Sequence, residues 1–202
     1  ALFAHWKTQP LTLRLVMLGL AVLGTLLCLH IPKVPPAGRL GKFRWNPFGE
    51  IATGMRALKG RRPLTLTLVG ISWFWFVGAL FQLALVLEAS EILHVKEAQA
   101  GLLFTALAIG IGVGSLMAGK SAGSNIELGL GPAGSRIMGV FTAVVAMATN
   151  YSTALVALAL VGFGGGFMAV PLNAYLQEEP GADEQGRMIA VNNLMNRVAM
   201  MV

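Results

Sequence analysis

The sequence contains few charged residues, few histidines and a single cysteine. Charged residues make up 12% of the chain, against about 25% in an average soluble domain. Cys28 stands alone in an apolar run, so the sequence provides neither a disulfide framework nor a zinc-ligand spacing. His5, His30 and His94 lie far apart and form no nucleophile–base pattern. These scarcities argue against a soluble domain, a metal site and an enzyme active site, and we expect no cofactor.

Apolar residues are abundant and occur in long runs. They make up 55% of the chain, and the mean hydropathy is +0.70. About 20 consecutive apolar residues are needed for a helix to cross the hydrocarbon of a bilayer. The runs predict an all-α, polytopic transmembrane helix bundle with five complete spans and part of a sixth, at residues 11–31, 64–87, 98–119, 131–149, 154–176 and 188–202.

The net charge of +6 is concentrated in one connector between the first two apolar runs. Residues 33–63 contain one acid, Glu50, and eight basic residues: Lys33, Arg39, Lys42, Arg44, Arg56, Lys59, Arg61 and Arg62. An excess of Lys and Arg in a loop indicates the cytoplasmic side of a membrane and gives no reason to expect nucleic acid. We therefore divide the chain into a transmembrane helix at 1–31, a basic connector at 32–63 and a transmembrane bundle at 64–202.

Within the connector, Pro47 begins a short amphipathic pattern. One helical face would carry Phe48, Ile51, Met55 and Leu58, with basic residues beside it. This pattern is typical of a helix lying at a membrane surface against anionic lipid. A solvated linker with some helical periodicity is the alternative. The chain also lacks an initiator Met and stops at Val202 inside an apolar run, which indicates a piece of a longer protein whose N-terminal transmembrane half is missing.

Residues 160–197 contain the most unusual pattern in the chain. An apolar run is interrupted by Gly164, Gly165, Gly166 and Pro171, which predict a hinge because Gly and Pro let a spanning helix bend. The same run, and the one that follows a short polar hairpin, also carry polar side chains. Such side chains at membrane depth are costly unless they face a bundle interior or a wet cavity. We therefore predict that they bind substrate: Asn173, Asn192, Asn196 and Arg197.

A second group of candidate residues lies in the span at 64–87. Tryptophans are usually found at membrane interfaces, whereas Trp73 and Trp75 fall nearer the middle of this span. They either line a cavity for a bulky apolar ligand or pack between helices. Gln82 has the same two interpretations, a substrate contact or an interhelical hydrogen bond. We include all three among the candidate substrate-binding residues.

The layout of the chain resembles the sixth to eleventh spans of a major facilitator superfamily transporter. A helix is followed by a long basic connector and then by helices joined by short loops. The phrases GISWFWFVGALFQ, GSLMAGKSAGSNIELGLGP, VPLNAYLQ and IAVNNLMN resemble the lysophospholipid transporter family, chiefly its members fused to a phospholipid acyltransferase. The resemblance covers residues 44–202. Gly114, Gly119 and Lys120 match part of the superfamily's G-x-x-x-D-R-x-G-R loop motif, but its aspartate and arginines are missing.

The resemblance implies a secondary transporter in a bacterial inner membrane. It would carry lysophospholipid, chiefly lysophosphatidylethanolamine, by alternating access for reacylation on the cytoplasmic side, with a fused or associated acyltransferase as partner. Two alternatives remain open: a proton-coupled exporter of drugs or small solutes, and a transport-inactive membrane anchor for an acyltransferase. An exporter normally needs a carboxylate inside the membrane, and Glu88 lies only at the end of a predicted span.

Overall fold

A computed structural model describes residues 10–30, 47–87, 95, 97–123, 126–181 and 184–201. These residues form helices joined by turns, and the described parts of the chain contain no strand. This confirms the predicted all-α fold. The chain divides into two compact units, Ala1–Phe43 and Arg44–Val202.

The first unit contains one described helix, α2 (Pro10–Leu29). It occupies most of the predicted span at 11–31. Twenty residues rise about 30 Å along a helix axis, which is the thickness of the hydrocarbon core. His30 follows the last turn, where its Nδ1 lies 3.0 Å from the backbone oxygen of Leu26. Leucine and valine side chains cover the helix and are exposed within this unit, as expected for a surface that meets lipid.

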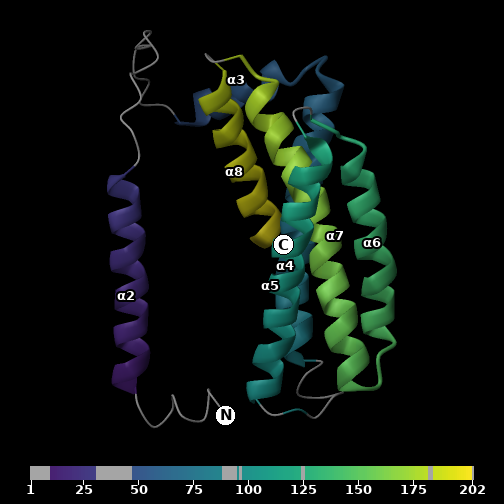
Figure 1. Ribbon diagram of the computed structural model, residues 1–202. Coiled ribbons are helices and arrows are strands. Elements are labelled where there is room, and N and C mark those ends of the chain that lie inside the picture. The colour runs from purple at the N-terminus through teal and green to yellow at the C-terminus, as the bar shows by residue number, and fades with distance from the viewer. Residues whose placement is uncertain are drawn as a thin grey trace. The chain divides into compact units, whose positions relative to one another are not determined.

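The described part of the second unit contains six helices. They are α3 (Pro47–Ala57), α4 (Arg62–Leu87), α5 (Glu97–Ala122), α6 (Leu130–Ala146), α7 (Tyr151–Glu178) and α8 (Gln185–Met201). Helices α4 to α8 run side by side, and α3 lies at the end of this bundle where α4 and α8 begin (Figure 1).

Three of the described helices are long and apolar enough to cross a membrane, at Arg62–Leu85, Ala98–Ala122 and Tyr151–Glu178. They coincide with three of the predicted spans. Two shorter apolar segments, Arg14–Leu29 and Leu130–Ala146, fall on two further predicted spans. The last predicted span, from residue 188, lies on α8, whose 17 residues include the polar side chains considered below.

Helix α7 is the central element of the bundle and packs against α4, α5, α6 and α8. Its contact with α5 is made between backbones. A Cβ atom added to Gly162 would collide with the carbonyl oxygen of Leu107, and one added to Gly114 would collide with that of Phe163. Small residues are favoured between membrane helices because they allow this close approach.

The predicted amphipathic helix is present as α3 and packs against α8. A Cβ atom at Gly54 would lie 2.5 Å from Cγ2 of Val191. Leu58, just past the end of α3, is buried in a cluster with Val191 and apolar residues of α4 and α7. Met55 is half exposed, and the side chain of Phe48 lies outside the described residues. Gly60, with φ of 89°, provides the left-handed turn between α3 and α4, a conformation that glycine adopts without strain.

Candidate functional site

A buried hydrogen bond joins α4 to α8. The hydroxyl of Ser72 donates to Oδ1 of Asn196 over 3.1 Å, and both residues are only 7% exposed. Asn192 lies one helical turn before Asn196, on the same face of α8, and is 6% exposed. Its Oδ1 is buried and accepts no hydrogen bond within the described parts of the chain. We call Ser72, Asn192 and Asn196 the α4–α8 polar seam.

The tryptophans of α4 are not buried by the described helices. Trp73 is 59% exposed and Trp75 is 45% exposed. Each ring contacts a phenylalanine ring of the same helix: Trp73 lies 5.4 Å from Phe76, and Trp75 lies 5.7 Å from Phe74, between ring centroids. Gln82, farther along α4, is also exposed. These side chains are therefore open to a ligand, to lipid or to another part of a larger protein.

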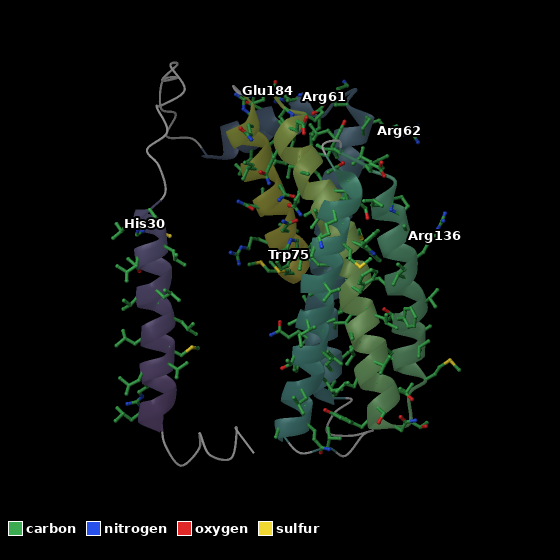
Figure 2. All side chains as sticks on the ribbon, viewed as in Figure 1. His30, Arg61, Arg62, Trp75, Arg136 and Glu184 are labelled. Atoms are coloured by element: carbon green, nitrogen blue, oxygen red, sulfur yellow. The ribbon has the colours of Figure 1, made fainter. Side chains whose placement is uncertain are left out.

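Arg197 follows Asn196 on α8 and is exposed. Within the described residues it makes no ion pair with a carboxylate. Because Ser72 precedes Trp73 and Asn196 precedes Arg197, the hydrogen bond of the polar seam brings the aromatic and cationic side chains to the same level of two packed helices. This level falls near the middle of α4 (Arg62–Leu87), where Figure 2 labels Trp75.

Asn173 is half-buried on α7, and its Nδ2 donates to the backbone oxygen of Ala169 over 2.8 Å. This is a bond within its own helix. The described structure contains no hydrogen bond between Asn173 and either Asn192 or Asn196. The seven candidate residues therefore fall into a buried pair on α8, a half-buried residue on α7 and an exposed group on α4 and α8.

The predicted hinge residues lie in a helix that is continuous from Tyr151 to Glu178, with Pro171 inside it. Successive residues of a helix point about 100° apart, so the three glycines face three different neighbours. Gly164 faces Gly134 of α6, Gly165 faces the ring of Phe74 on α4, and Gly166 faces the backbone of α5. The glycines thus have a packing role, and bending at these positions remains a prediction.

An ion-pair cluster, which we call the Arg61 clasp, closes one end of the bundle. The guanidinium of Arg61 donates to Glu184 over 2.6 Å and to Glu179 over 3.0 Å. Figure 2 labels Arg61 and Glu184 at this end of the bundle. The hydrogen bond with Glu184 raises the pKa of Arg61, and Glu179 adds to the effect. The clasp joins the start of α4 to both sides of the α7–α8 hairpin. The clasp gives two acids of this hairpin, Glu179 and Glu184, a basic partner.

A groove of about 710 Å³ lies between α4, α6 and α7. Its walls are mainly apolar, with Leu66 on α4 and Leu172 on α7, and Arg62 lies among its lining residues. Pattern reasoning identified neither this groove nor Ser72, because a serine within an apolar run gives no signal of its own. Among the described residues, no group of three or more His, Cys, Asp or Glu side chains is arranged to hold a metal ion.

The chain matches one family model and several individual proteins. The family model described as Major Facilitator Superfamily matches residues 2–202. The lysophospholipid transporter LplT of Pectobacterium carotovorum (strain PC1) is 34% identical over 205 residues, which cover 98% of this chain and 49% of that protein. The LplT of Serratia proteamaculans (strain 568) is 32% identical over 179 residues, covering 86% of this chain and 44% of that protein.

A third relative, the LplT of Yersinia enterocolitica, is 34% identical, again covering 86% of this chain and 44% of that protein. The chain spans about half the length of the curated relatives it matches. No solved structure matches the chain.

Proposed function

The chain belongs to the major facilitator superfamily, and on that premise we propose that it forms part of a secondary transporter that moves lysophospholipid across a bacterial inner membrane. The curated relatives named lysophospholipid transporter support this substrate class. The remaining spans, including the other wall of the substrate cavity, belong to the rest of the transporter. The substrate moves inward for reacylation by an acyltransferase on the cytoplasmic side.

The observation that carries the proposal is that aromatic side chains of α4 and Arg197 of α8 lie at one level of the two packed helices. A lysophospholipid has a single acyl chain and a charged headgroup. Trp73 and Trp75 are two residues apart and point to nearly opposite sides of α4. The acyl chain packs against whichever of these exposed rings faces the substrate path, where an aromatic side chain provides a large apolar contact area. The phosphate binds Arg197, because a guanidinium can form two parallel hydrogen bonds to phosphate oxygens. Asn173 lies near the level of Gly70, because Leu172 packs against Gly70, and Gln82 is twelve residues farther along α4. These two amides contact the substrate at different depths of its path.

In this proposal the transporter works by alternating access, with the substrate site near the middle of the membrane. The described spans support such a site because they carry neutral amides rather than carboxylates at depth. Asn192 and Asn196 are buried on α8, and no Asp or Glu lies within the three long apolar segments until the last residue, Glu178. This distribution favours a carrier of amphipathic lipid over a proton-coupled exporter that relies on a carboxylate of these helices.

Uptake of labelled lysophosphatidylethanolamine into spheroplasts, which carry the complete transporter, tests the proposal. We expect Arg197→Ala to lower uptake about 10-fold or more, which is the size of a lost charged hydrogen bond, and Arg197→Lys to lower it less. Arg136 provides the matched control, because it is an exposed arginine on α6, away from α8 (Figure 2). Arg136→Ala is expected to retain wild-type uptake.

Absence of uptake by a well-expressed wild-type transporter would overturn the proposal, and drug-efflux assays would then test the exporter. Equal losses in the Arg197→Ala and Arg136→Ala variants would remove Arg197 from the binding site. Quantification of each variant in the membrane separates a binding defect from a loss of protein.

A further inference from the structure

The buried oxygen of Asn192 is the least satisfied group of the polar seam. Buried side-chain oxygens are nearly always hydrogen-bonded, and each exception requires an explanation. The hydroxyl of Ser72 does not donate to this oxygen, because that hydroxyl donates to Asn196. Oδ1 of Asn192 therefore remains an acceptor without a donor in the described structure.

Asn192 lies at the margin of the α4–α8 contact rather than at its centre. The residue before it, Val191, is fully buried, and the residue after it, Asn193, is exposed. Met188, one turn earlier, is also fully buried. The acceptor thus adjoins apolar side chains on one side and an open polar edge of α8 on the other. Oδ1 itself is buried, so a donor that approaches along this edge reaches it when the side chains there move aside.

We propose that Oδ1 of Asn192 accepts a hydrogen bond from the free glycerol hydroxyl of the lysophospholipid. This inference rests on the proposed function and deepens it, because that hydroxyl is the group that distinguishes a lysophospholipid from a diacyl phospholipid. A diacyl lipid carries an ester at the same carbon, and an ester oxygen can only accept hydrogen bonds. Two acceptors would then face each other, and the oxygen of Asn192 would stay unpaired.

Recognition of this kind discriminates strongly, because a protein site built around a substrate hydroxyl rejects an analogue that lacks it. The cost comes from the buried protein group that is left without a partner. The bond between Ser72 and Asn196 has a positioning role, since it fixes α8 against α4 one turn beyond Asn192. Asn192 itself contacts the substrate and distinguishes a lipid with a free glycerol hydroxyl from one whose hydroxyl carries an acyl chain.

A 2-deoxy lysophosphatidylethanolamine, in which the glycerol hydroxyl is replaced by hydrogen, is the sharpest probe. A diacyl lipid would also be excluded by its bulk, whereas the deoxy analogue has the same headgroup, charge and acyl chain as the natural lysolipid. In proteoliposomes containing the complete transporter, we expect the wild type to prefer the hydroxyl-bearing lipid on the order of 10-fold. Equal transport of both lipids by the wild type would overturn the inference without any variant.

Two leucine substitutions complete the test. Asn192→Leu removes the acceptor at similar volume, and we expect it to abolish the preference by slowing only the hydroxyl-bearing lipid. Asn193→Leu changes the neighbouring exposed asparagine and is expected to keep the preference. An Asn192→Leu protein that still prefers the hydroxyl-bearing lipid would overturn the assignment. Failure of the wild type to move either lipid would overturn the proposed function itself, so the two failures are distinguishable.

Discussion

Gly134 and Gly164 face each other across the contact between α6 and α7. A Cβ atom at Gly134 would lie 2.5 Å from the carbonyl oxygen of Gly164, and one at Gly164 would lie 2.7 Å from that of Gly134. The relationship is reciprocal, so neither helix has room for even one methyl group. Here the two backbones themselves form the interface.

We expect Gly134→Ala to destabilise the bundle by about 1–3 kcal/mol, the usual cost of adding atoms to a filled contact. Gly139 on the same helix provides the control, because a Cβ there meets no atom within 4 Å. Thermal unfolding of both variants in detergent measures the difference. Equal melting temperatures would contradict the close contact between α6 and α7.

Ser72→Ala is expected to cost about 1 kcal/mol, because it leaves Oδ1 of Asn196 buried without a donor. Ser135→Ala is the control, since that exposed hydroxyl donates only to the backbone oxygen of Pro132 in its own helix. The double change Ser72→Ala with Asn196→Leu should recover part of the loss, because both polar partners are then gone. Chemical denaturation of the wild type, these three variants and Asn196→Leu alone checks this order, and additive losses from the two single changes would exclude a direct bond.

The Arg61 clasp should contribute more to local order than to overall stability. Partly exposed ion pairs are usually worth about 1 kcal/mol or less, and the side chain of Arg61 is 30% exposed. We expect Arg61→Ala to speed hydrogen exchange in the hairpin between α7 and α8, and Arg61→Lys to restore only part of the protection because an ammonium lacks the planar fork. Arg62→Ala, at the adjacent exposed arginine, is the control. Unchanged exchange in the Arg61→Ala hairpin would contradict the clasp.

Pro171→Ala tests the predicted hinge. The substitution restores a backbone donor toward the carbonyl of Phe167 and removes the steric pressure of the proline ring. If α7 bends there during transport, the variant should be at least as stable as the wild type and transport several-fold more slowly. Pro132→Ala, in the first turn of α6 where proline costs little, should transport normally. Wild-type transport by Pro171→Ala would place the motion elsewhere.

The fold class and most helices could be predicted from the sequence because apolar runs of membrane-spanning length have few other interpretations. Pro47 marked the start of α3 because proline is favoured at the first position of a helix. The contacts of α3 could not be predicted. Its packing on α8 depends on Gly54 meeting Val191, residues more than 130 positions apart in the chain.

The candidate site was only partly predictable. Polar residues in an apolar run attract attention, so Asn192, Asn196 and Arg197 could be selected. Their division into buried and exposed side chains depends on how α8 is rotated against α4, and the sequence of α8 does not say which neighbour it meets. Ser72 was overlooked because one hydroxyl in a membrane helix can always bond to its own backbone. The glycines of α7 were interpreted as flexible, although their neighbours pack directly against them.

The three consecutive glycines lie at the midpoint of α7, between Tyr151 and Glu178. Neighbours on three sides contact the helix at that level. If α7 tilts as a rigid body about this level, one of its ends moves toward the centre of the bundle while the other moves away from it. A single tilt of α7 about the glycines would then close the transporter on one side of the membrane and open it on the other.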